Sequence, residues 1–152
     1  MGGTTSRAGG SSDGPGAVSG SRKLESLDDA ECRRLLASCH LGRVGLINQG
    51  EPVVVPVHYL FHEGAVIFQT AVGGLLDPAN ASTAMAFEID ATDAVFHSGW
   101  SVLVRGIAEG ITDRESIARL CVLPLRPWVS RDDHRWVRLW PREITGRRIP
   151  KL

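Results

Sequence analysis

Two apolar runs separated by a short turn dominate the middle of the chain. The first covers residues 53–61, the second residues 65–70, and Glu63-Gly64 lies between them. β-Branched and aromatic residues on both sides of a glycine-containing turn are typical of a β-hairpin. Pro56, inside the first run, has no amide hydrogen and indicates a bulge or a strand edge without a neighbour. The pattern therefore predicts a hairpin that leaves backbone groups free for a ligand.

Other segments predict further strands and three short helices. A capping pattern at Asp28 and Glu31, followed by apolar residues on one face, predicts a helix with Gly42 just beyond its end. The sequence Thr112–Glu115 predicts a second capping box, with a helix to about Cys121, and residues 75–81 have room for about two helical turns. We expect the other strands at residues 43–47, 84–90, 100–111, 135–139 and 143–149, with Gly106 at a bend or bulge, residues 91–99 in a loop and Pro141 splitting the last two strands. Several short strands with few helices indicate a small antiparallel barrel.

The first 22 residues have a different composition from the rest. They are rich in glycine, serine and other small residues and show no apolar periodicity. Such a segment buries too little apolar surface to offset its chain entropy. We therefore expect a disordered tail at residues 1–22 and one domain at residues 23–152.

Charge and composition exclude several classes of function. The 17 basic and 17 acidic residues give a formal net charge of zero, which disfavours a nucleic-acid partner. No apolar run approaches the roughly 20 residues of a membrane span, and no signal-peptide pattern is present. The three cysteines, expected to be buried thiols, are typical of a reducing compartment. We expect a cytoplasmic protein with no membrane partner.

No pattern of side chains predicts a metal site or a covalent nucleophile. The five histidines show no spacing typical of metal ligands, and no serine or cysteine lies in a known nucleophile motif. We assign no catalytic side chain and no metal ligand.

Five segments in order resemble the pyridoxamine 5'-phosphate oxidase-like, FMN-binding split β-barrel family. They are residues 41–45, 55–59, 68–76, 99–106 and 143–149. The resemblance implies a mainly β fold, a six-stranded antiparallel Greek-key split β-barrel. It also implies a homodimer that binds FMN, or a deazaflavin instead, and acts as an oxidoreductase on a small organic substrate.

The resemblance also implies where the cofactor lies. The flavin ring follows one strand, its phosphate lies near the loop at residues 70–75, and a second strand lies alongside. The Gly73-Gly74 turn is itself suited to an anion, because its amides are not obstructed by side chains. The implied cofactor-binding residues are Val55, Pro56, Val57, Phe68, Gln69, Thr70, Gly73, Gly74, Leu75, Trp100 and Ser101.

Two of these positions depart from the family pattern. Members often carry arginine and lysine where this chain has Gln69 and Leu75. A phosphate here needs amides, a helix N-terminus or another arginine, such as Arg43 or Arg147. The alternative is a degenerate, non-catalytic barrel that serves as a ligand-binding or interaction module. Trp128 is assigned to the site or to the dimer interface.

Overall fold

A computed structural model describes residues 23–79, 83–126 and 133–151. The expected tail at residues 1–22 and Trp128 lie outside these residues. The elements are β1 (Glu25–Leu27), α1 (Asp29–Ser38), β2 (Leu41–Asn48), β3 (Glu51–His62), β4 (Ala65–Ala71), β5 (Ala84–Asp93), β6 (Ser98–Ile111), α2 (Arg114–Cys121) and β7 (His134–Ile149).

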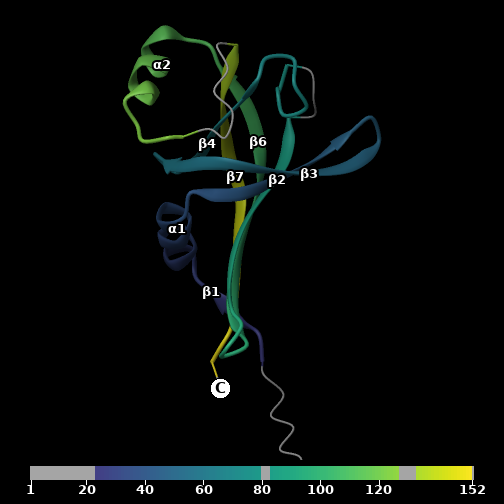
Figure 1. The fold of residues 1–152 in the computed structure, drawn as a ribbon, viewed down its shortest axis with the longest axis vertical. Helices are drawn as coiled ribbons and strands as arrows, with labels where there is room; N and C mark the ends of the chain where they lie inside the picture. The colour runs from purple at the N-terminus through teal and green to yellow at the C-terminus, as the bar shows by residue number, and fades with distance from the viewer. Residues whose placement is uncertain (1–22, 80–82, 127–132, 152) are drawn as a thin grey trace, which may run out of the picture.

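The six long strands form a closed antiparallel ring. Their order is β7-β4-β3-β2-β5-β6, and a further ladder between β6 and β7 closes the ring. The short β1 pairs with the end of β7. In Figure 1, β6 and β7 run the length of the view, and the β2–β3 hairpin extends away from them to the right. The predicted six-stranded split barrel is confirmed.

Two tight turns fix the register of the first three long strands. The turns Gln49-Gly50 and Glu63-Gly64 both have positive φ at their two central residues. This is the geometry of the two-residue hairpin turn whose twist matches that of the flanking strands. The predicted hairpin at residues 53–70 is therefore present, with β3 longer at both ends than expected.

Strand β7 is continuous, whereas the sequence predicted two strands separated by Pro141. Gly106 of β6 lies opposite Pro141, and Arg105 lies opposite Glu143, so Arg142 is an extra residue on β7. A bulge accepts a proline because its missing N–H is not needed there. The bend expected at Gly106 is confirmed: a Cβ at Gly106 would overlap the Trp140 carbonyl.

Three smaller expectations about the helices are wrong. Residues 75–79 form turns and no helix. The cap of α2 is Asp113, one residue later than the expected box, and its carboxylate accepts from the Ser116 amide at 2.8 Å. Gly42 does not end α1; it lies in β2, where a side chain would overlap the Phe87 ring.

Two other differences concern the second strand pair and the thiols. Strands β5 and β6 extend into the loop expected at residues 91–99, leaving only residues 94–97 between them. Cys121 is exposed and Cys39 partly buried, so only Cys32 is the buried thiol expected. No helix in the described ranges is long and apolar enough to cross a membrane.

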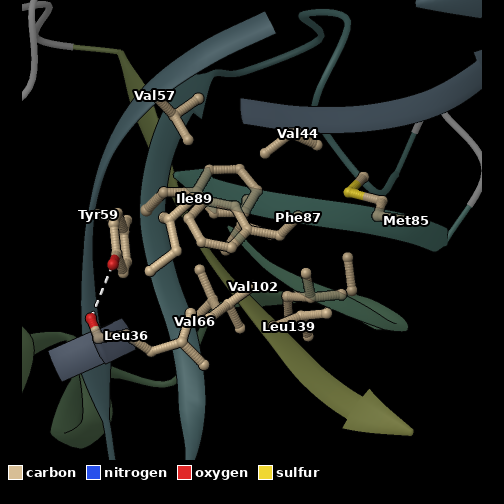
Figure 2. Close-up of a cluster of buried hydrophobic side chains, with 14 of the residues drawn as sticks. Leu36, Val44, Val57, Tyr59, Val66, Met85, Phe87, Ile89, Val102 and Leu139 are labelled. Atoms are coloured by element: carbon tan, nitrogen blue, oxygen red, sulfur yellow. Dashed lines mark hydrogen bonds between the residues drawn. The ribbon is translucent and has the colours of Figure 1, made fainter. Parts of the chain in front are cut away.

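Helix α1 closes one end of the barrel and is tied to its core. Asp28 caps the helix as predicted, accepting from the Glu31 amide at 2.8 Å. The Tyr59 hydroxyl donates to the Leu36 carbonyl at 2.7 Å, as Figure 2 shows, and the Tyr59 ring packs edge-on against Phe87. Burial raises the pKa of Tyr59, which keeps its hydroxyl protonated and able to donate.

We predict that Gly42→Ala destabilises the barrel by about 2 kcal/mol, because the new methyl group would overlap Phe87 and lie 2.9 Å from the Glu88 carbonyl oxygen. Gly45→Ala on the same strand is the control, since its Cβ meets only ordinary contacts at 3.8 Å and beyond. Urea denaturation of both variants measures the difference. Equal stability of the two would contradict this account of Gly42.

Candidate functional site

The barrel opens where β3 and β4 part. Strand β3 pairs with β2 from Glu51 to His58, but with β4 only from Tyr59 to His62. Beyond the Tyr59–Phe68 pair, β4 continues along β7 alone. The first half of β3 and the last residues of β4 therefore diverge without pairing, and we call this divergence the wedge.

The alternation of backbone hydrogen bonds decides which groups of β3 face this wedge. The Tyr59 amide donates to the His40 carbonyl, on the β2 side, at 2.9 Å. Successive residues of a strand direct their N–H and C=O groups to opposite sides, so the other odd-numbered residues also bond to β2. The even-numbered residues Pro52, Val54 and Pro56 direct theirs to the edge that has no strand partner in the described chain.

From Pro52 to Pro56 this edge has one donor and several acceptors. Proline at positions 52 and 56 provides a carbonyl but no N–H, so Val54 supplies the only amide hydrogen between them. The edge position expected for Pro56 is confirmed. Another strand needs donors at alternate residues, so the prolines oppose strand addition while leaving Val54 accessible to a smaller ligand.

The structure modifies the expected roles of Val55, Pro56 and Val57. The backbone groups of Val55 and Val57 belong to the ladder with β2, and their side chains pack on the core. Pro56 is exposed and directs its carbonyl to the open edge. Sequence reasoning missed Val54, whose side chain is 69% exposed. The signal that could have found it is the spacing of Pro52 and Pro56, which places both on one edge.

Backbone amides of the loop after β4 donate hydrogen bonds to acceptors within the same loop. The Gly73 amide donates to the Asp77 carboxylate at 2.8 Å, and the Gly74 amide donates to the Ala71 carbonyl at 3.0 Å. The Ala79 amide donates to the second oxygen of Asp77 at 3.0 Å. In this conformation the two glycine amides expected to bind a phosphate already have acceptors. These side-chain bonds also explain why turns replace the expected helix.

Asp77 is the one buried charged side chain in the described residues, at 1% exposure. Its carboxylate lies 2.8 Å from Nε of Arg135 on β7. Burial alone would raise the pKa of Asp77, but the Gly73 and Ala79 amides and the Arg135 charge together lower it. The carboxylate is therefore ionised and holds the loop against β7.

The remaining residues expected around the loop have mixed environments. Phe68 is fully buried in the barrel core, so only its backbone could contact a cofactor. Gln69 and Thr70 are partly buried, and Leu75 is exposed. Thr70 lies directly opposite Arg135 in the ladder between β4 and β7. Gln69 and Thr70 lie at the end of β4, beyond its last pair with β3, and Leu75 lies in the loop that follows.

Trp100 and Ser101 lie far from this loop within one chain. Trp100 is opposite Arg148 on β7, whereas Thr70 is opposite Arg135 on the same strand. Those two arginines are thirteen positions apart, which corresponds to roughly 40 Å along the strand. Trp100 instead lines a small cavity near the β5–β6 turn, with a volume of about 280 Å³. A single chain therefore does not bring all the expected site residues together.

The two arginines named as alternative phosphate ligands are placed elsewhere. Arg43 makes ion pairs with Glu88 and Asp90 on β5. Arg147 lies opposite Ser101, at the far end of the barrel from the loop. Arg135, which the sequence did not single out, is the arginine beside the loop. The described ranges contain no group of three or more metal-binding side chains.

Comparison with protein families matches residues 28–148 to the family described as pyridoxamine 5'-phosphate oxidase. The chain belongs to the pyridoxamine 5'-phosphate oxidase family. Among its relatives is the uncharacterized protein Rv0080 of Mycobacterium tuberculosis, 36% identical over 133 residues, with 84% of this chain and 87% of that protein covered.

Solved structures with similar folds include two bacterial proteins. A FAD binding protein from Mycobacterium smegmatis is 34% identical with a TM-score of 0.70, and the match covers 83% of this chain and all of that one. A conserved protein of unknown function from Corynebacterium diphtheriae is 28% identical with a TM-score of 0.71, covering 84% and 98% of the two chains. Both structures therefore share the fold of this chain over most of its length.

We predict that Asp77→Asn destabilises the protein by about 2 kcal/mol at neutral pH, because it removes a charged acceptor from two amides and from Arg135. The pKa of Asp77 lies below its ordinary value of 3.8 in the folded state, so its contribution is complete above that value and is lost as the pH falls through the folded pKa. The difference in unfolding free energy between wild type and variant should therefore narrow as the pH falls below about 4.

Urea denaturation across this pH range measures this difference. Asp90→Asn, which breaks an exposed ion pair with Arg43, is the control and should change stability by less than about 1 kcal/mol. If Asp77→Asn lowers the unfolding free energy by the same amount down to the lowest pH, the buried Asp77 carboxylate is not ionised as described.

Proposed function

We propose that this protein binds a flavin, with FMN as the first candidate, and acts as an oxidoreductase on a small organic substrate. The observation that carries the proposal is the open edge of β3, with the Val54 amide between the carbonyls of Pro52 and Pro56. A flavin ring presents an imide, an N–H between two carbonyls. Val54 offers the matching donor and acceptor on one residue.

The surroundings of this edge also suit a planar ring. The wedge beyond the Tyr59–Phe68 pair gives a ring access to the strand, and the loop at residues 71–77 lies at its end. A bound flavin supplies the hydride and electron transfer, which no amino-acid side chain provides. The chain would bind the ring, orient it and exclude water from one face. We assign no side chain as acid or base.

Relatives support a flavin and also widen the choice among flavins. The Mycobacterium smegmatis relative is named as a FAD binding protein. FMN, FAD and deazaflavins share the imide edge that Val54 would meet. The protein is therefore to be titrated with each of the three, following the visible absorption of the ring. Binding of one of them in the micromolar range or tighter is the expected outcome, and no binding of any would overturn the proposal.

The proposal includes a homodimer, because one chain leaves its expected site residues at opposite ends. A second copy could bring Trp100 and Ser101 to the wedge of the first. An apolar cleft of about 610 Å³ beneath the β2–β3 hairpin, bordered by the exposed Ile47 and Val54, offers surface for such a contact. Exposed apolar patches of this kind commonly mark interfaces.

A non-catalytic ligand-binding or interaction module is the second candidate. It is favoured by the neutral Gln69 and Leu75 and by the Gly73 amide, which donates to Asp77. The two candidates separate in the titration: a flavoprotein binds flavin and is reduced by a chemical or nucleotide donor, whereas a module of this kind binds no flavin.

We predict that Val54→Pro weakens flavin binding at least tenfold with little loss of stability, because the Val54 amide makes no ladder bond. The matched control is Val55→Pro, which removes an amide of the β2–β3 ladder and should destabilise the barrel by about 3 kcal/mol. Fluorescence titration and urea denaturation measure the two effects. Unchanged affinity in a folded Val54→Pro variant would place the ring elsewhere.

We predict that flavin affinity depends on protein concentration, because the site needs both subunits. Light scattering should show a dimer at micromolar concentration, and dilution below the dimer dissociation constant should release the flavin. Trp100→Ala should weaken binding although Trp100 lies far from the wedge of its own chain. A monomer that binds flavin with the same affinity at every concentration would contradict the shared site.

A further inference from the structure

Arg135 is held at the end of the barrel by its neighbours. It lies directly opposite Thr70, so the two side chains share one face of the sheet. A Cβ at Gly110 of β6 would lie 3.0 Å from Cδ of Arg135. The absence of a side chain at Gly110 therefore leaves room for the arginine to lie across the strand.

Asp77 fixes the guanidinium from the buried side. Its Oδ1 lies 2.8 Å from Nε of Arg135, while the Gly73 amide bonds to Oδ2 and the Ala79 amide to Oδ1. Two backbone amides therefore donate to the carboxylate, and Arg135 forms an ion pair with it. The Arg135 side chain is 23% exposed, and its Nε is buried and lies close to Asp77 without the geometry of a hydrogen bond.

We infer that Arg135, positioned by Asp77 and Gly110, is the cation that binds the phosphate of the flavin. This inference rests on the proposed function. The terminal fork of a guanidinium matches two phosphate oxygens, and the Thr70 hydroxyl beside it adds a further donor. This arrangement supplies the positive charge that Gln69 and Leu75 do not provide.

Asp77 then has a second role besides holding the loop against β7: it positions Arg135 for the ligand. A flexible surface arginine loses side-chain entropy when it binds an anion. The ion pair with Asp77 and the space at Gly110 hold the side chain in advance, with Nη1 3.6 Å from the Cβ position of Gly110. Asp77 is therefore a positioning residue, and Arg135 is the group that touches the ligand.

The test compares FMN with riboflavin, which carries the same ring without the phosphate. In the full-length protein, Arg135→Gln should lower FMN affinity about tenfold to a hundredfold and leave riboflavin affinity unchanged. Asp77→Asn should lower FMN affinity by several-fold, again without an effect on riboflavin. Increasing salt should weaken FMN binding to the wild type more than to Arg135→Gln.

Arg138→Gln is the matched control. Arg138 lies on the same strand with a similar exposure of 22%, but it pairs with Glu109 and packs over the Trp140 ring. Its alternate position on β7 places it on the other face of the sheet. This variant should bind FMN and riboflavin as the wild type does.

The outcomes distinguish a failure of the role assigned to Arg135 from a failure of the proposed flavin binding. Flavin binding with an FMN-to-riboflavin ratio that is the same in wild type and Arg135→Gln overturns the inference and leaves the proposed function standing. If no flavin binds, the proposed function fails, and pyrophosphate is used as the probe instead. A rise in melting temperature with pyrophosphate that Arg135→Gln abolishes would then support the anion site, and an equal rise in both proteins would overturn it.

Discussion

The structure depends on a change of partner along one strand. Strand β3 pairs with β4 from Tyr59 to His62 and with β2 from Glu51 to His58, so the second stretch has no strand on its other side in the described chain. A closed barrel satisfies every backbone group within its ladders, whereas a strand that leaves the ring exposes one edge. The proposed ligand site is that edge. The even-numbered residues of β3 direct their N–H and C=O groups to this edge, and these groups set its hydrogen-bonding pattern.

The rest of the fold keeps the barrel closed in spite of this departure. Strand β7 pairs with β4 at one end and with β6 along most of its length, and a bulge at Pro141 adjusts its register to both. The point where β3 leaves is fixed by Tyr59, which packs on Phe87 and donates to the carbonyl of Leu36. These groups are fully buried, and their contacts stabilise β3 at the point where its partner changes.

Local signals in the sequence predicted the elements well where one residue type decides the geometry. The edge at Pro56, the bend at Gly106 and the cap at Asp28 follow from a missing N–H, a missing side chain and a short carboxylate. Pro141 misled the prediction, since a proline ends a strand in one context and occupies a bulge in another. The difference lies in the register with β6, which no local pattern encodes.

The site was harder to predict because its parts come from distant segments. Asp77 and Arg135 are 58 residues apart in the sequence, and their ion pair depends on the ladder between β4 and β7. The Asp77-Pro78 pair is a turn signal that could have argued against a helix at residues 75–81. The resemblance grouped Trp100 with the loop, whereas the registers separate them within one chain. To predict which of these distant segments meet, the sheet topology must be known, and local sequence patterns do not give it.

Amide hydrogen exchange of β3, measured by NMR with and without saturating FMN, tests the central claim most directly. In the free protein the Val54 amide should exchange quickly, while the Val53 and Val55 amides, which face β2, should be protected. On binding, the Val54 amide should become protected by at least tenfold, with little change at its two neighbours. An unchanged Val54 exchange rate in the flavin-bound protein would contradict the open edge as the ring site.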